Sequence, residues 1–435
     1  MTNKRVAFHT LGCKVNQSEA EAMQSLFRKA GYSVVDFEAE ANVYVIHTCT
    51  VTHSGDRKSR QMIRKAIKNN KDAIVVVTGC YAQIAPGDVL KIPGVDLVIG
   101  TQYRGQIVDL VSQVGKDRQP INKVQDILRT KVFEELILEE TGRVRGFIKI
   151  QEGCQNFCTY CIIPFARGPV RSRQPENIIQ EANRLVGLGY QELVLTGICT
   201  GAYGQDLQEG INLNWLLKEL TAVPGLLRVR ISSLDPNDFT PALVETLTSY
   251  ELFCPHLHIS LQSGSQSVLQ RMRRKYSTPQ FADLVGKLRE KRPGIAITTD
   301  IMVGFPGETA EEHRASLDFV KELELADLHV FKYSPRQGTK AAGFPDQVDA
   351  KTKDIRSAQF IDLGKILAKN YADKFLNKTV AVLVETDLGN NIWEGHTDNY
   401  LKVRFTGKGE LRNRLLPIVL RELKDGYLIG EATSL

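Results

Sequence analysis

Six of the eight cysteines in this 435-residue chain form two sets of three. One set is compact, with Cys154, Cys158 and Cys161 in the segment GCQNFCTYCIIP. The other set is dispersed, with Cys13, Cys49 and Cys80 in the segments LGCKVN, IHTCTVT and TGCYAQ. Iron–sulfur clusters are usually held by four thiolates, so three thiolates leave one iron with an open coordination position. Two sets of three therefore predict two clusters, each with an iron available for chemistry.

A zinc site is the alternative interpretation of the compact set. Zinc sites more often use paired Cys-x-x-Cys segments or four Cys and His ligands, and this segment offers neither. The segment MTNKRVAFHTLGCKVN lacks an extended apolar core before a small-residue cleavage site, so we expect no secretory signal. No apolar run approaches the ~20 residues that span a bilayer. We therefore expect a cytoplasmic protein without a membrane partner, whose cysteines serve metal binding or catalysis rather than disulfides.

The first third of the chain alternates between strand-like and helix-like segments. Strands are expected at 5–10, 42–48, 73–79 and 95–100, and helices at 18–30, 56–69 and 105–114. This order predicts a Rossmann-like parallel sheet domain over residues 1–116. Cys13, Cys49 and Cys80 each come shortly after a strand, and the carboxyl ends of parallel strands share one edge. We expect the fold to bring these three thiols together.

A second alternating series follows a polar linker at 117–143. Its strands are expected at 147–151, 192–197, 227–233, 256–262, 296–304 and 327–333. Six such units predict a partial (β/α)6 barrel over residues 144–375, with its chemistry at the carboxyl ends of the strands. The compact cysteine set follows the first of these strands. Five short strand-like segments then predict a small β-barrel over residues 376–435, so the chain as a whole is α/β.

Basic residues are clustered, although the net charge is only +6. Seven Lys and Arg occur from Arg57 to Lys71 without an acid, and six occur from Lys402 to Arg421 with one acid. Such clusters are typical of a polyanion partner, and solvated helix faces are the alternative. The candidate RNA contacts are Arg57, Lys58, Arg60, Lys402, Arg404, Arg412 and Arg414.

The segment GCQNFCTYCIIP resembles the cluster-binding loop of the radical S-adenosylmethionine (SAM) enzymes. The resemblance implies that Cys154, Cys158 and Cys161 hold a catalytic 4Fe–4S cluster whose open iron binds SAM. A reduced donor of the flavodoxin or ferredoxin type then supplies the electron that releases a 5′-deoxyadenosyl radical. Four SAM contacts are implied at strand ends, with turn or core roles as the alternative: Gly197, Ser233, Gln262 and Asp300.

The segments LGCKVNQSEAE, HTCTVT and GCYAQ resemble those of the methylthiotransferases. In that family Cys13, Cys49 and Cys80 correspond to the ligands of an auxiliary 4Fe–4S cluster that carries sulfur. The resemblance also implies a sulfur or cluster supply system and a C-terminal TRAM domain for RNA contact.

The segments HTCTVTHSGDRKSRQMIRK, CTYCIIPFARGPVRS and LTGICTGAYG are closest to the branch that acts on threonylcarbamoyladenosine. That branch implies a tRNA (N6-L-threonylcarbamoyladenosine-C2)-methylthiotransferase that modifies the anticodon stem-loop. Isopentenyladenosine in tRNA and a ribosomal-protein aspartate are alternative substrates. A non-catalytic iron–sulfur RNA-binding protein is the alternative of another class. The chain departs from the branch at His47, where Asn is usual, and at Cys199, where His is usual.

Overall fold

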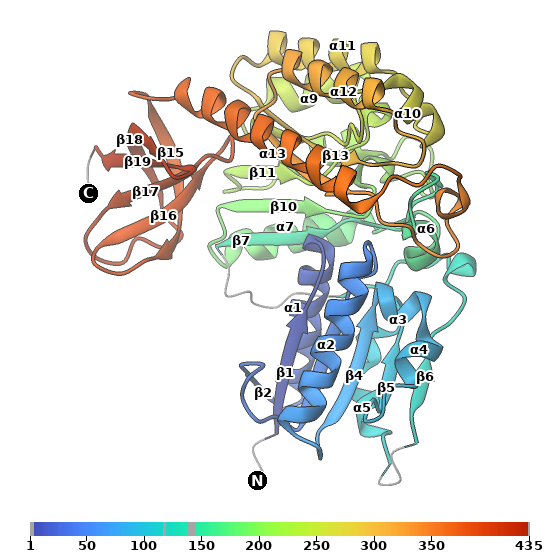
Figure 1. Cartoon of the computed structure of the whole chain (residues 1–435). Helices are drawn as coiled ribbons and strands as arrows, with labels where there is room; N and C mark the ends of the chain where they lie inside the picture. Colours follow the sequence, from blue (N-terminus) through green and yellow to red (C-terminus); the bar gives the residue numbers. More distant parts are fainter. Residues whose placement is uncertain (1–3, 116–118, 137–143, 434–435) are drawn as a thin grey trace. The chain divides into compact units, whose positions relative to one another are not determined.

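The computed structural model describes residues 4–115, 119–136 and 144–433. The described residues form two compact units. The first comprises residues from 1–141, 149–173 and 334–342, and the second comprises residues from 142–148, 174–333 and 343–435. Figure 1 colours the chain from the blue N-terminal sheet to the red C-terminal barrel. In the described residues no helix is both long and apolar enough to cross a membrane.

The first unit contains a six-stranded sheet in which every pairing is parallel. Its strand order is β2–β1–β3–β4–β5–β6. The strands are β1 (Arg5–Thr10), β2 (Ser33–Val35), β3 (Val43–Thr48), β4 (Ile74–Gly79), β5 (Leu97–Ile99) and β6 (Ile121–Lys123). The predicted parallel sheet is thus confirmed. The edge strands β2 and β6 were not expected, and β6 lies within the predicted linker.

Helices cover both faces of this sheet. On one face, α1 (Lys14–Lys29) and α5 (Ile107–Ser112) contribute residues such as Met23 and Leu110 to an apolar core. On the other face lie α2 (His53–Asn69), α3 (Cys80–Ile84) and α4 (Pro86–Leu90), which contribute Ile63, Ala82 and Val89. Buried strands with helices on both sides leave the carboxyl edge as the place where polar chemistry is accessible.

The cysteine loop of 154–161 also belongs to the first unit. It is preceded by β8 (Gln151–Glu152) and followed by α6 (Ile163–Arg167) and β9 (Arg171–Ser172). The two short strands pair antiparallel, with Glu152 opposite Arg171. The loop is therefore closed at its base by a backbone ladder.

The second unit contains the β/α strands. One sheet has the order β11–β10–β7 and the other has the order β12–β13–β14. Two isolated parallel bridges, Val229 with Phe253 and Leu234 with Ile259, link them. The strands are β7 (Arg145–Lys149), β10 (Glu192–Thr196), β11 (Arg228–Ile231), β12 (His256–His258), β13 (Ala296–Val303) and β14 (Asp327–Lys332). The principal helices are α7 (Pro175–Gly187), α8 (Leu213–Leu220), α9 (Pro241–Ser249), α10 (Gln266–Arg271), α11 (Thr278–Lys291), α12 (Ala310–Glu322) and α13 (Ala350–Asp373). The six predicted strands are confirmed as a partial barrel.

A closed five-stranded barrel ends the chain, as predicted. Its order is β15–β16–β17–β19–β18, around a core that includes Trp393, Phe405 and Ile418. The strands are β15 (Thr379–Asp387), β16 (Ile392–Thr397), β17 (Lys402–Thr406), β18 (Leu415–Lys424) and β19 (Tyr427–Ala432).

Candidate active site and its cysteine sets

The dispersed cysteines lie at one edge of the N-terminal sheet. Cys13 caps α1 just after β1, Cys49 directly follows β3, and Cys80 is the first residue of α3, directly after β4. Strands β1, β3 and β4 are adjacent in the sheet. Burial is the main cause that raises the pKa of Cys80 to about 12, and the nearby Cys49 and Cys13 thiols raise it further. The structure therefore brings this set together, and none of the eight cysteines forms a disulfide.

A glycine immediately precedes Cys13, Cys80 and Cys154. Each of these three glycines has a positive φ, a backbone conformation that residues with a side chain rarely adopt. Gly12 has φ +109°, and a Cβ there would lie 3.1 Å from the Cβ of Cys49. At Gly79, with φ +96°, a Cβ would lie 2.5 Å from the carbonyl oxygen of Thr48. At Gly153, with φ +78°, it would lie 1.8 Å from the carbonyl oxygen of Pro169. Only glycine permits these close approaches, so these glycines set where the thiols point.

The compact cysteine loop is held by its own backbone. The amide of Cys154 donates to the carbonyl of Gly168 over 3.0 Å, and the amide of Cys161 donates to the carbonyl of Cys158 over 2.9 Å. Phe157, with φ +45°, packs edge-to-face on Phe165 at 5.8 Å between ring centroids. Three thiols on one short, braced loop fit a single cluster with one open iron, and they do not supply the four ligands of a structural zinc site.

Gly153→Ala is expected to displace the compact loop, because its Cβ has no room beside Pro169. We expect at least half of the iron that this loop binds to be lost, measured as iron and acid-labile sulfide per chain after anaerobic reconstitution. Gly187→Ala is the matched control, since a Cβ at that position meets nothing within 4 Å. Equal iron content in the two variants would contradict the steric argument.

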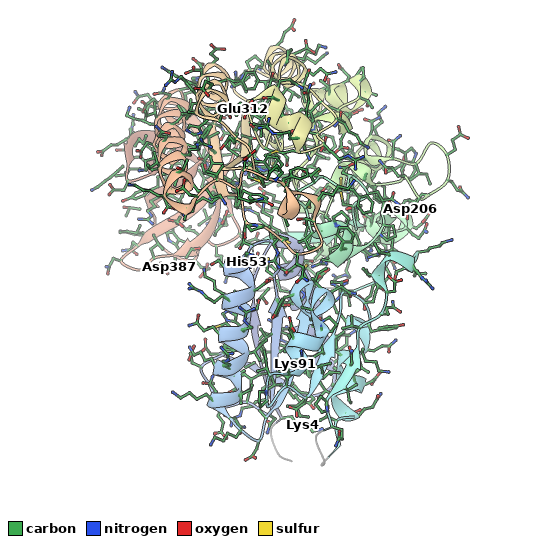
Figure 2. The ribbon with its side chains drawn as sticks, turned by 45° about the vertical axis from the view of Figure 1, so that its right-hand side comes forward. Lys4, His53, Lys91, Asp206, Glu312 and Asp387 are labelled. Atoms are coloured by element: carbon green, nitrogen blue, oxygen red, sulfur yellow. The ribbon has the colours of Figure 1, made fainter. Side chains whose placement is uncertain are left out.

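The loop that follows Cys49 is held by contacts with residues 334–342, which are distant in the sequence. The backbone amide of His53, at the start of α2 (Figure 2), donates to Ser334 Oγ over 3.1 Å. Arg336 Nη2 donates over 2.6 Å to both Thr50 Oγ1 and Asp56 Oδ2. The segment 334–342 thus contacts the residues that flank a cysteine of the dispersed set.

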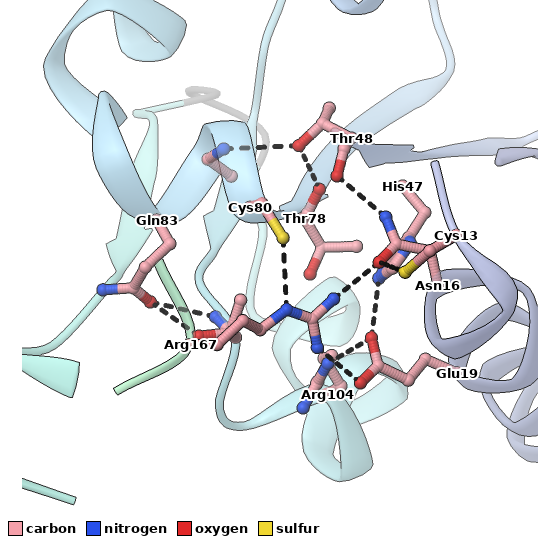
Figure 3. A network of polar contacts seen from close by, with 12 residues as sticks. Cys13, Asn16, Glu19, His47, Thr48, Thr78, Cys80, Gln83, Arg104 and Arg167 are labelled. Atoms are coloured by element: carbon pink, nitrogen blue, oxygen red, sulfur yellow. Dashed lines mark hydrogen bonds and ion pairs between the residues drawn. The ribbon is translucent and has the colours of Figure 1, made fainter. Parts of the chain in front are cut away.

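Beneath the dispersed cysteines lies a buried network of charges (Figure 3). Glu19 forms an ion pair with Arg104 at 2.5 Å and accepts hydrogen bonds from Arg167 and Lys149, each over 2.7 Å. Glu152 contacts Arg167 at 3.1 Å and also pairs with Lys149. The side chains of these five residues are between 0% and 9% exposed. Burial alone would raise the pKa of Glu152, but Lys149 and Arg167 lower it to about 2.

His47 belongs to this network. Its Nε2 lies 3.3 Å from Glu19 Oε2, and its side chain is fully buried. Burial lowers the pKa of His47, although Glu19 opposes this effect. The sequence prediction that His47 lies beside a cluster ligand is consistent with its place at the end of β3, and its partner Glu19 was not foreseen. Glu19, Arg104 and Arg167 were missed because a buried ion network has no periodic signal in the sequence.

The four candidate SAM contacts all lie on the second unit. Gly197 and Ser233 follow the ends of β10 and β11. Gln262 has φ +70°, and its backbone amide donates to the backbone carbonyl of Asp300 over 2.8 Å. Asp300, however, lies inside β13 rather than at its end, because the pairing with β14 continues to Val303. That positional expectation was wrong, whereas the role of each of the four residues stays a prediction.

Asp300 already has two histidine neighbours. Its Oδ1 lies 3.3 Å from His258 Nε2 and 3.5 Å from His329 Nδ1. Burial would raise the pKa of Asp300, but hydrogen bonds with these histidines hold it well below its usual value. A ribose hydroxyl would therefore meet a carboxylate whose position is set by two imidazoles. Cys199, the other unusual residue, caps the 3₁₀ turn Thr200–Ala202.

The candidate RNA contacts differ in how they are paired. Arg57 and Lys58 are exposed on α2, whereas Arg60 donates to Tyr81 Oη over 3.2 Å. In the barrel, Lys402 and Arg404 share the carboxylate of Glu394, at 3.8 and 2.8 Å. The remaining two candidates, Arg412 and Arg414, are exposed on the loop before β18.

The comparisons agree with this geometry. Residues 5–100 match a family described as Uncharacterized protein family UPF0004, and residues 148–320 match the Radical SAM superfamily. A solved structure of the radical S-adenosylmethionine methyltransferase TsrM from Kitasatospora setae has the same fold, with a TM-score of 0.58. It is 16% identical and covers 78% of this chain and 77% of its own. The fold and the cysteine loop thus define a radical SAM protein.

Full-length relatives narrow the class. The threonylcarbamoyladenosine tRNA methylthiotransferase MtaB of Bacillus subtilis is 49% identical, over 98% of this chain and 95% of its own. MtaB of Aquifex aeolicus is 38% identical, over 94% and 98%. A tRNA-2-methylthio-N(6)-dimethylallyladenosine synthase of Moorella thermoacetica is 36% identical, over 97% of each chain. This chain belongs to the methylthiotransferase family of radical SAM proteins.

Proposed function

We propose that this protein methylthiolates C2 of N6-threonylcarbamoyladenosine next to the anticodon of tRNA. The observation that carries the proposal is the pair of three-cysteine sets within one compact unit. The relatives named for threonylcarbamoyladenosine support this substrate, at 49% and 38% identity over nearly the whole chain. A cytoplasmic location, a reduced flavodoxin- or ferredoxin-type donor and a sulfur supply system belong to the same proposal.

The chemistry explains why two clusters are needed. An aromatic C–H bond is too weakly acidic for side-chain bases, which contribute only about 10²- to 10⁴-fold to a rate. When bound, SAM and the two clusters supply the radical that activates this bond and the sulfur that replaces its hydrogen. The chain holds one cluster through Cys154, Cys158 and Cys161 and the other through Cys13, Cys49 and Cys80. Its basic surfaces hold the anticodon loop while the target base leaves the stack.

Mass spectrometry of nucleosides tests the substrate. Bulk tRNA is compared between cells with the gene, cells without it, and deleted cells complemented with the Cys158→Ala variant. The proposal expects the methylthio group to be absent from threonylcarbamoyladenosine alone in the last two. Loss from isopentenyladenosine instead would place the chain in the other tRNA branch. Unchanged tRNA would direct attention to the ribosomal-protein aspartate.

We expect Arg412 and Arg414 to contribute most of the phosphate contact of the barrel, because both side chains are exposed on the loop before β18 whereas the guanidinium of Arg404 is only partly exposed and held by Glu394. The double variant Arg412→Gln/Arg414→Gln should reduce the slope of log affinity against log salt by about 2 for an anticodon stem-loop. The matched pair Lys402→Gln/Arg404→Gln should change it less. Salt-titrated fluorescence anisotropy measures both, and a larger effect of the second pair would contradict this assignment.

A further inference from the structure

Arg167 directly contacts a cysteine of the dispersed set although it belongs to the segment of the compact set. It ends α6, which begins two residues after Cys161, and its side chain is fully buried. Its Nε donates to Cys80 Sγ over 3.1 Å (Figure 3). A guanidinium donor at this distance from a sulfur is placed for a charge-assisted N–H···S hydrogen bond.

The remaining edges of the guanidinium are held rigidly. Nη1 donates to Glu19 Oε1 over 2.7 Å and to Glu152 Oε1 over 3.1 Å. Nη2 donates to Asn16 Oδ1 over 2.6 Å. Each of the three guanidinium nitrogens therefore has an acceptor. These bonds fix the plane of the group, so the N–H of Nε has one orientation, toward Cys80 Sγ. A lysine, with a single flexible ammonium group, would not reproduce this arrangement.

Asn16 extends the contact to a second cysteine. Its side-chain amide donates to the carbonyls of Leu11 and Thr48, over 2.8 and 3.1 Å. These two bonds fix the amide so that Oδ1 faces both Arg167 and Cys13 Sγ, which lies 3.6 Å away. Arg167 thus reaches Cys80 directly and the surroundings of Cys13 through one residue.

We propose that Arg167 is a positioning residue that ties the SAM-cluster loop to the auxiliary cluster and stabilises the reduced state of that cluster through the Cys80 sulfur. The inference rests on the proposed role of Cys13, Cys49 and Cys80 as cluster ligands. Hydrogen bonds to cluster sulfurs withdraw electron density and raise the reduction potential. Glu152 and Arg167 flank the compact cysteines, so their contact also holds the two ends of that loop together.

The midpoint potential of the auxiliary cluster is measured in the full chain with Cys154, Cys158 and Cys161 replaced by alanine. These replacements remove the ligands of the other cluster. Each protein is reconstituted anaerobically, its iron and sulfide are counted, and its cluster is titrated potentiometrically with electron paramagnetic resonance detection. In this background, Arg167→Gln is expected to lower the ratio of reduced to oxidised cluster about tenfold at fixed potential. This change corresponds to a midpoint ~59 mV lower for a one-electron couple.

Arg104→Gln is the matched control. Arg104 is equally buried and also pairs with Glu19, so its loss removes the same charge, but no hydrogen bond joins it to a cysteine sulfur in the described structure. A smaller shift in this control supports the N–H···S bond. An equal shift, or no shift in Arg167→Gln, overturns the inference.

Arg167→Lys keeps the charge and covers the case in which the glutamine variant does not load a cluster. An intermediate shift supports the proposal, and a potential equal to that of the parent contradicts it. If the parent background itself binds no cluster, the assignment of the three ligands fails, and this inference fails with it. The two failures are therefore distinguishable by the iron content of the parent.

Discussion

We expect Cys158→Ala to abolish both SAM cleavage and methylthio transfer, which is the largest effect on activity expected of any variant. The reason is that the compact loop offers three thiolates, so the variant keeps two of the four protein ligands that iron–sulfur clusters usually have. We expect the formation of 5′-deoxyadenosine to fall to background, a loss of more than about 10⁶-fold. Chromatography with mass detection of 5′-deoxyadenosine and of modified stem-loop RNA measures the two activities separately.

Cys80→Ala should separate these activities. It leaves the compact loop intact, so SAM cleavage is expected to continue while the methylthio product disappears. Cys254→Ala is the control for the loss of a buried thiol, since Cys254 belongs to neither set. Product formation by Cys80→Ala, or loss of both activities by Cys254→Ala, would contradict the division of roles between the two sets.

Glu19→Gln has the largest expected effect on stability. The carboxylate of Glu19 meets three cationic side chains within 2.7 Å, and it is 1% exposed. Removing one charge from a buried ion network costs about 3–5 kcal/mol, because the remaining charges are left uncompensated. Amide hydrogen exchange in β1, β3 and β4 should accelerate by about 10²-fold or more where these amides exchange through opening of this unit.

Glu38→Gln is the matched control in the same unit. Glu38 pairs with Lys65 on the surface, where its side chain is 64% exposed, and such pairs contribute about 0–1 kcal/mol. Protection of the sheet amides from hydrogen exchange should therefore be unchanged in this variant. Equal protection in the Glu19 and Glu38 variants would show that the buried network does not stabilise the sheet.

The same buried network predicts that the folding stability of this unit depends on pH. The pKa of Glu152 is about 2 in the folded chain, against an ordinary value of 4.5, because Lys149 and Arg167 outweigh its burial. A carboxylate with a depressed pKa stabilises the fold fully above its unfolded pKa. This stabilisation is lost as the pH falls from about 4.5 toward 2.

The local sequence determined most of the architecture. Hydrophobic alternation located all six strands of the partial barrel and the five of the C-terminal barrel, since each signal lies within a few residues. The rule that parallel strands end at one edge was enough to predict that Cys13, Cys49 and Cys80 converge. Glycines directly before three cysteines were visible too, but the contacts that require them, such as Gly153 with Pro169, were not.

Only the tertiary structure decided which side chains meet. The edge strand Ile121–Lys123 is too short and polar to be recognised without its partner β5. Glu394 pairs with Arg404 and lies near Lys402 across β16 and β17, which a count of charges along the chain does not reveal. Arg167 and Cys80 are 87 residues apart, and their hydrogen bond exists because two separate backbone elements converge. Short-range pattern thus specifies where the strands and the cysteines fall, whereas long-range packing determines the charges around them.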